Sequence, residues 1–305
     1  MANEISIKIF LEKNNLQNTE YVTFPFYFGG EKLESFSEKH ARWGMTLLKA
    51  GAMRFRWNEN NENRNAVLKS ILTDLKNPIC TGNCSSSKGE CDCKLKISPI
   101  EMIHSRDIFE AKREGDTKNL TGDGVYTKNP LLVPTVTVAD CVPIFLYDKK
   151  KKAFGAFHSG WKGTGIICEG IKKFISEYDS KIQDLCVAIG AHIGDCCYFV
   201  DEKRAEYFIK NFGEKCVKKL TDVENHKEFP FRLSLTEANL FALKKYGIFD
   251  ENIVVAEDCT CCSKFKNGEN IFGSFRRQAA FLPPEIDSDT RSRAMTVQAA
   301  FVYLP

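Results

Sequence analysis

The strongest constraint on the fold lies in residues 135–162, which read TVTVADCVPIFLYDKKKKAFGAFHSGWK. Two apolar runs, 136–147 and 153–157, flank four consecutive lysines at 149–152. Apolar runs rich in β-branched and aromatic residues and bounded by polar turns are typical of buried strands. We therefore expect neighbouring strands joined by the lysine turn, and a solvated turn is a better interpretation of these lysines than a binding patch.

Reactive side chains interrupt the first run and end the second. Asp140 and Cys141 break the first run, and His158 stands at the end of the second. Adjacent strands would bring Cys141 and His158 within reach of one metal ion or one substrate atom. Thiolate and neutral imidazole are good zinc ligands, and they are also the two partners of a cysteine nucleophile. A buried thiol beside a hydrogen-bonded core histidine is the third interpretation that these residues leave open.

The composition is that of an ordinary soluble protein, with 43% apolar and 27% charged residues in 305. A net charge of +3 is too small to predict nucleic-acid binding. No apolar run approaches the ~20 residues of a membrane span, and the first residues do not resemble a secretion signal. The 13 cysteines are odd in number, which argues against a complete disulfide framework. We expect a cytoplasmic protein.

A catalytic zinc site needs a third protein ligand beside Cys141 and His158. The spacing of the other histidines does not choose one. Cys196 and Cys197 are adjacent, and consecutive strand residues face opposite ways, so we expect them in the core rather than as ligands. The other histidines are His40, His104, His192 and His226. A separate group of thiols, spaced more loosely than paired CxxC motifs, consists of Cys80, Cys84, Cys91 and Cys93.

The pattern of elements predicts an α+β fold. Apolar periodicity predicts helices over 38–50, 63–75, 163–178 and 201–212, and Ser234 with Glu237 forms a capping box for a helix that Gly247 ends. Strands are expected over 5–11, 24–28, 185–189, 252–256, 272–277 and 294–303. Without a strict βαβ rhythm, we expect a single-domain sandwich of mixed sheets flanked by helices over residues 1–305, with a Cys-rich insertion at about 77–99.

Several separate motifs resemble one known family. ADCxP at 139–143 and HSGWKG at 158–163 are the clearest, and further matches lie at 102–105, 122–127, 190–198, 259–277 and 292–293. Together they resemble the family labelled multicopper polyphenol oxidase (laccase), whose members are similar to zinc-dependent purine nucleoside phosphorylases with adenosine deaminase activity.

The resemblance implies a set of site residues. It supplies His104 as the third metal ligand beside Cys141 and His158, with zinc as the metal and copper the weaker choice. It also places an acid at Asp140 or Asp123, and we take Asp140 with Cys141 and His158 as catalytic. The candidate substrate-binding residues are Arg64, Trp161, Lys162, Arg277 and Arg293.

The resemblance implies a purine nucleoside enzyme. It would split adenosine, inosine, guanosine or methylthioadenosine with phosphate, giving the base and ribose 1-phosphate, and would deaminate adenosine. Bound zinc lowers the pKa of water, and arginine suits bidentate phosphate binding. One alternative is a cysteine hydrolase, for instance in cell-wall processing. The other is a copper polyphenol oxidase, for which five histidines are too few to build mononuclear and trinuclear sites together.

Overall fold

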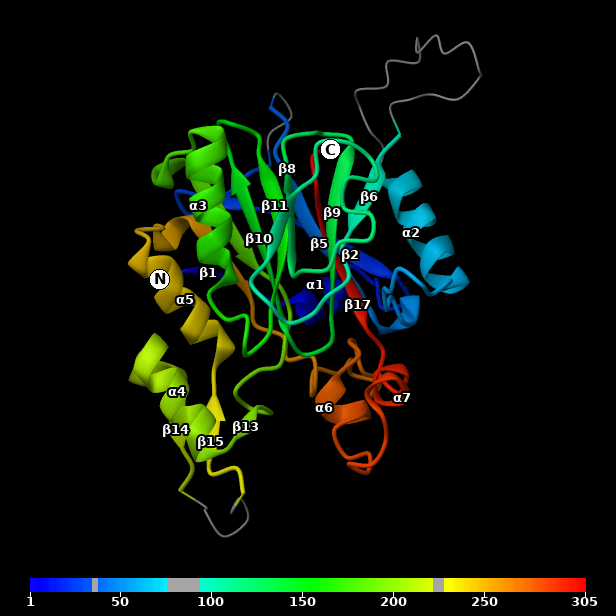
Figure 1. The fold of residues 1–305 in the computed structure, drawn as a ribbon, viewed down its shortest axis with the longest axis vertical. Coiled ribbons are helices and arrows are strands. Elements are labelled where there is room, and N and C mark those ends of the chain that lie inside the picture. Colours follow the sequence, from blue (N-terminus) through cyan, green and yellow to red (C-terminus); the bar gives the residue numbers. More distant parts are fainter. Residues whose placement is uncertain (35–37, 76–93, 222–227) are drawn as a thin grey trace.

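The computed structural model describes residues 1–34, 38–75, 94–221 and 228–305. Two mixed β-sheets pack face to face, with helices on their outer surfaces (Figure 1). The seven-stranded sheet has the order β1 (Asn3–Ile5), β16 (Ile253–Ala256), β12 (Leu185–Ile189), β10 (Val142–Asp148), β11 (Phe154–Ser159), β8 (Gly124–Thr127) and β7 (Ile108–Glu110). The five-stranded sheet has the order β2 (Tyr21–Pro25), β5 (Arg42–Thr46), β17 (Gln298–Tyr303), β9 (Leu132–Val138) and β6 (Lys96–Pro99).

Smaller elements complete the fold. A three-stranded sheet has the order β13 (Phe199–Val200), β15 (Phe231–Leu233) and β14 (Val217–Lys219). A two-stranded ribbon consists of β3 (Tyr27–Phe28) and β4 (Glu31–Lys32). The helices are α1 (Ile7–Lys13), α2 (Glu62–Asp74), α3 (Ile166–Tyr178), α4 (Glu202–Phe212), α5 (Leu235–Lys245), α6 (Phe275–Gln278) and α7 (Ser288–Arg293). The α+β sandwich of mixed sheets flanked by helices is confirmed, whereas the single-domain assignment stays a prediction.

The main core lies between the two sheets. Trp43 of β5 stacks on Phe145 of β10 with 5.3 Å between ring centroids, and both are fully buried. Helix α3 covers the outer face of the seven-stranded sheet with Ile167, Ile171 and Phe174, which recur at helical spacing. Helix α2 covers the outer face of the five-stranded sheet (Figure 1). Each apolar face is therefore matched to a sheet, which fixes the layers.

The first apolar run folds differently from a single interrupted strand. Residues 132–138 form β9 of the five-stranded sheet, and residues 142–148 form β10 of the seven-stranded sheet. The chain therefore crosses from one sheet to the other through residues 139–141. The lysine turn does join antiparallel strands, as expected, with Pro143 of β10 opposite His158 of β11.

Three expected elements are wrong. Residues 5–11 form the end of β1 and most of α1, because Ser6 caps the helix by accepting a hydrogen bond from the Ile9 backbone N–H. Residues 38–50 contain β5 and a short 3₁₀ helix at Leu48–Ala50 rather than one α-helix, since sheet pairing outweighs their helical pattern. Residues 272–277 lead into α6, which Ser274 caps. Local capping decides two of these three cases.

The expected insertion is only partly described. Cys80, Cys84, Cys91 and Cys93 lie outside the described residues, as does His226. Residues 96–99, which we placed in the insertion, form β6 and pair in parallel with β9. Among the described residues, no helix has both the length and the apolar character needed to cross a membrane.

Candidate metal centre

Three side chains meet where the chain crosses between the sheets. Cys141 comes from the β9–β10 crossing, His158 from β11, and His104 from a bend between β6 and β7. One ligand atom from each of these three residues lies within 4.8 Å of the others. We call His104, Cys141 and His158 the pocket cluster. The structure thus brings together the three residues that the family resemblance proposed as metal ligands.

The crossing requires unusual backbone geometry. Asp140 has a φ of 78° and His104 a φ of 60°, both in the left-handed region. Asp and His enter this region more readily than most side chains, and β-branched residues do so at high cost. The left-handed residue Asp140 lies within the three residues that carry the chain from β9 to β10. This places Cys141 directly before β10, near the end of the neighbouring strand that carries His158.

Asp123 fixes the two histidines of the pocket cluster. Its side chain is fully buried, and one oxygen lies 2.7 Å from Nδ1 of His158. The backbone N–H groups of His104 and Ser105 donate to the same carboxylate at 3.0 and 2.5 Å. Burial would raise the pKa of Asp123, but hydrogen bonds from His158 and Ser105 outweigh it and lower that pKa. Asp123 therefore stays ionised and directs Nε2 of His158 toward Cys141.

Cys141 and His158 shift each other's protonation. Burial would raise the pKa of the Cys141 thiol, but the charge of His158 and a hydrogen bond from His104 outweigh it and lower that pKa to about 6. Burial would lower the pKa of His158, but the Cys141 thiolate and Asp123 raise it to about 10. The pair thus favours a thiolate, which is the form that binds metals and attacks electrophiles.

Asp140 points to a different set of partners. Its carboxylate accepts hydrogen bonds from the Thr260 hydroxyl at 2.6 Å, the Ser274 hydroxyl at 3.0 Å and the Arg276 backbone N–H at 2.6 Å. These contacts tie the crossing to the turn after β16 and to the start of α6. In this geometry Asp140 holds the backbone beside Cys141, and Asp123 is the carboxylate that contacts the pocket cluster.

A small pocket opens onto the pocket cluster. Its volume is about 100 Å³, against ~300–1,000 Å³ for typical small-molecule sites, so it accommodates the reacting end of a ligand and not a whole nucleoside. Residues from five parts of the chain line it: Arg54, Phe55, Arg56, Met102, His104, Thr137, Ala139, Cys141, His158, Ser292, Met295 and Val297. Among these described lining residues none carries a carboxylate.

Two arginines that no motif singled out, Arg54 and Arg56, line the pocket, and Arg54 is the more buried. Its side chain is 12% exposed and forms ion pairs with Glu59 and Asp289. Its Nη1 atom is buried without a hydrogen-bond partner among the described residues. No motif around position 54 signalled this role, because the pocket forms only when this loop packs against the strand ends.

The predicted arginines lie behind or beside the pocket. Arg64 is 6% exposed, donates to the Arg54 carbonyl at 2.9 Å and stacks on the Phe55 ring at 4.8 Å. Arg277 donates from Nη1 to the carbonyls of Thr260 and Cys261, at 2.9 and 2.6 Å. Neither residue lines the pocket; Arg64 touches its wall through the Arg54 carbonyl and the Phe55 ring, whereas the partners of Arg277 lie outside the pocket lining.

The remaining predicted residues are nearer the surface. Arg293 bonds to Asp289 at 2.8 Å and to Glu59 at 3.2 Å, and thereby shares both carboxylates with Arg54. Trp161 stacks under the Arg204 guanidinium at 4.5 Å, and Lys162 lies over the same ring at 5.4 Å. Neither Trp161 nor Lys162 lines the pocket.

Comparison with known proteins identifies the family. The family model described as multi-copper polyphenol oxidoreductase laccase matches residues 83–281. The chain belongs to this family. The matched segment contains the whole pocket cluster and Asp123, whereas Arg54 precedes it and Ser292, Met295 and Val297 follow it.

Curated relatives carry the name purine nucleoside phosphorylase. The human protein LACC1 is 32% identical over 174 residues, which are 55% of this chain and 38% of that protein. YlmD of Bacillus subtilis (strain 168) is 29% identical over 182 residues, which are 58% of this chain and 62% of YlmD. The matches thus span less than two thirds of either relative.

Solved structures show the same fold. The Bacillus licheniformis protein YfiH has a TM-score of 0.66 and 24% identity, with coverage of 87% of this chain and 93% of that one. YlmD from Geobacillus stearothermophilus also has a TM-score of 0.66, with 21% identity and coverage of 87% and 92%. The architecture is therefore shared over most of both chains.

Proposed function

We propose that this protein is a zinc-dependent purine nucleoside phosphorylase. The observation that carries the proposal is the convergence of His104, Cys141 and His158 at a pocket that also contains a buried arginine, Arg54. The relatives named purine nucleoside phosphorylases support this activity. The substrates are adenosine, inosine, guanosine or methylthioadenosine, with phosphate as the second substrate.

The donor set fits zinc. Two imidazoles and one thiolate are ligands of a catalytic zinc site with one open position, and Asp123 supplies the hydrogen bond that orients a metal-binding histidine. When bound, the metal acts as a Lewis acid that polarises a substrate oxygen or lowers the pKa of a coordinated water. Copper suits the proposal less, because His40 and His192 lie outside the pocket cluster.

Arg54 is our candidate for phosphate binding, in place of Arg64. An arginine presents a planar fork to a phosphate, and Nη1 of Arg54 lacks a hydrogen-bond partner among the described residues. In phosphorolysis a phosphate oxygen bonds to C1′ as the bond from C1′ to the base breaks. Arg54 would hold the phosphate for that attack, while Arg64 positions the backbone of Arg54.

Deamination of adenosine is the weaker of the two activities in this proposal. Nucleobase deaminases use a carboxylate beside the metal to move protons. Asp123 already accepts hydrogen bonds from His158 and from two backbone amides, and the described pocket lining contains no other carboxylate. We therefore expect phosphorolysis to be faster than deamination.

A cysteine hydrolase is the second candidate, because one observation favours it. Cys141, His158 and Asp123 form a chain in which a thiolate lies beside an imidazolium that a buried carboxylate orients. Such a nucleophile would act without metal and would react with iodoacetamide at Cys141. Zinc bound to Cys141 would block this reaction, so alkylation with and without a chelator separates the two functions.

The decisive experiment supplies nucleosides with and without phosphate. Purified protein is incubated with adenosine, inosine or methylthioadenosine, and the products are identified by mass spectrometry. Phosphate-dependent release of the base with ribose 1-phosphate is the expected result, together with loss of activity after chelation and recovery with zinc. Turnover that ignores phosphate, or activity that survives complete metal removal, would contradict the proposal.

The proposal includes the setting of the enzyme. We propose a single catalytic domain in the cytoplasm, acting on small molecules and not on nucleic acid or membranes. The 13 cysteines, odd in number, support a reducing compartment, because they argue against a complete disulfide framework.

A further inference from the structure

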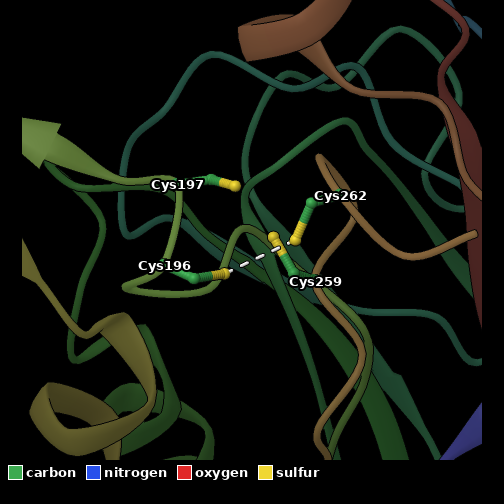
Figure 2. A group of neighbouring side chains, drawn as sticks. All are labelled: Cys196, Cys197, Cys259 and Cys262. Carbon is green, nitrogen blue, oxygen red and sulfur yellow. Dashed lines mark hydrogen bonds between the residues drawn. The ribbon is translucent and has the colours of Figure 1, made fainter.

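A second group of cysteines lies near the pocket cluster. Cys196 and Cys197 come from the turn after β12, and Cys259 and Cys262 from the turn after β16. Their four sulfur atoms lie within 4.8 Å of one another. Figure 2 shows the side chains converging from the two segments toward one point. We call these four residues the thiol cluster, and we propose that it binds a structural zinc ion.

The spacing of the sulfurs matches a tetrahedral zinc site. With Zn–S bonds of ~2.3 Å, tetrahedral geometry places sulfur atoms ~3.8 Å apart. The sulfurs of Cys196 and Cys262 are 3.6 Å apart, and the whole set falls within 4.8 Å. Small side-chain rotations would therefore bring all four sulfurs into a zinc coordination sphere. Four thiolates at this distance repel each other unless a cation neutralises them, which favours a metal over an empty ionised cluster.

The backbone around the thiol cluster supports a metal-bound thiolate. The Gly194 N–H donates to the Cys259 sulfur at 3.2 Å. A side chain at Gly194 would be crowded, because its Cβ would lie 3.1 Å from the Cys196 sulfur and 3.3 Å from Cβ of Cys259. Hydrogen bonds to ligand atoms orient metal ligands and tune their basicity. The close backbone approach at Gly194 thus serves the cluster directly.

The sequence carried a signal for this site that we interpreted differently. Cys259-Thr260-Cys261-Cys262 has the C-x-x-C spacing of structural zinc sites. We expected Cys196 and Cys197 in the core because consecutive strand residues face opposite ways. They lie instead in a turn, where both side chains can face one point. Cys196 and Cys262 are exposed, so a metal ion can reach the cluster from solvent.

The position of the thiol cluster explains what a metal there would stabilise. Thr260, inside the C-x-x-C segment, donates its hydroxyl to Asp140 and its N–H to the His192 carbonyl at 3.0 Å. Asp140 immediately precedes Cys141 of the pocket cluster. A zinc ion in the thiol cluster would hold the two turns together and so fix the backbone beneath the pocket cluster. Its role is structural, because none of its four ligands lines the pocket.

The test measures zinc content and cobalt absorption. The cysteines at 80–93 are first replaced by serine, so that they cannot bind metal. The resulting background variant is expected to bind about two zinc ions per chain. The double change Cys196→Ser with Cys262→Ser should lower zinc to about one per chain and remove most of the sulfur-to-cobalt charge-transfer absorption of the cobalt-loaded protein. The substitutions in the background are Cys80→Ser, Cys84→Ser, Cys91→Ser and Cys93→Ser.

A matched control separates ligand loss from general thiol loss. Cys168→Ser removes a partly exposed thiol of α3 outside the thiol cluster and should leave zinc content and cobalt absorption unchanged. Unchanged zinc in the Cys196 and Cys262 double variant would overturn the proposal. So would a disulfide between Cys196 and Cys262, found by peptide mapping of protein purified without reductant, in a chain that binds no second zinc. Because Cys141→Ala empties only the pocket cluster, it distinguishes failure of this site from failure of the proposed function.

Discussion

The pocket cluster and the thiol cluster are neighbouring groups built on different principles. The pocket cluster has three mixed donors, a carboxylate that orients one of them, and a pocket over it. The thiol cluster has four sulfur donors and no residue in that pocket. Three ligands leave a position for a substrate, whereas four fill a tetrahedral ion. By the number and type of its donors, the pocket cluster suits chemistry and the thiol cluster suits a structural ion.

Hydrogen bonds to Asp140 join the two regions, among them one from the Ile193 N–H at 3.0 Å. Thr260 lies between two cysteines of the second turn and donates to Asp140, which holds the crossing next to Cys141. The thiol cluster that these bonds join includes the exposed thiols of Cys196 and Cys262, and the pocket cluster includes the buried His158. Changes on the pocket side should therefore affect catalysis first, and changes on the thiol side should affect stability first.

Removing the thiol of the pocket cluster should have the largest effect. We expect Cys141→Ala to lose the pocket metal and to reduce phosphorolysis more than about 100-fold, which exceeds the usual effect of losing an orienting residue. Metal analysis and activity are measured on the same sample, with circular dichroism as the check on folding. Normal activity with a normal pocket metal in Cys141→Ala would remove the basis for calling this cluster catalytic.

Replacing the orienting carboxylate should have the next largest effect. Asp123→Asn keeps the size of the side chain but removes the charge that holds His158, so we expect metal affinity and activity to fall about 10–100-fold. Competition with a chelating dye measures the affinity. Asp107→Asn, an exposed carboxylate in the same region, is the matched control. An equal loss in both variants would point to net charge and not to orientation.

The arginine changes test which side chain holds phosphate. We expect Arg54→Ala to slow phosphorolysis about 10–100-fold, since a charge-assisted contact is worth ~1.5–3 kcal/mol, with a smaller effect on deamination. Arg54→Lys should recover little, because lysine lacks the planar fork. The dependence of the rate on phosphate concentration is the measurement. If Arg64→Ala impairs phosphate use selectively while Arg54→Ala does not, the assignment returns to Arg64.

The smallest expected effect is on the pH dependence of stability, through His192 in the segment that leads to Cys196 of the thiol cluster. His192 lies at 3% exposure, and its ring contacts the Gly190 carbonyl and the Thr236 hydroxyl, each at 2.8 Å. Burial lowers the pKa of His192, so the unfolded chain binds a proton more readily than the folded one. This contribution to stability is present above the unfolded pKa of ~6.5 and is lost as pH falls through the folded value.

Denaturant unfolding of the metal-free protein at pH 7.5 and 5.5 measures this contribution. We expect stability to fall toward pH 5.5, by up to ~1.4 kcal/mol for each unit of pKa difference. His192→Gln should reduce the difference in stability between the two pH values. The same variant, purified with its metal, should keep the metal of the pocket cluster. A difference that is unchanged in His192→Gln would assign the pH dependence to other groups, such as His40, whose pKa burial also lowers.

Local patterns in the sequence predicted the local parts of this protein. The lysine turn and its apolar flanks predicted the β10–β11 pairing that brings Cys141 near His158, because neighbouring antiparallel strands need only a short connection. The helical periodicity of residues 163–178 predicted α3, and the capping box at Ser234 predicted α5. Motif resemblance added His104, which spacing could not choose.

Contacts between distant segments follow from the tertiary packing. It divided the first apolar run between two sheets, since burial against different partners overrode the continuity of the pattern. It brought Arg54 to the pocket and paired Cys196 and Cys197 with Cys259 and Cys262, more than sixty positions away. Such contacts depend on how complete sheets and turns pack, and periodicity within a short window contains no information about them.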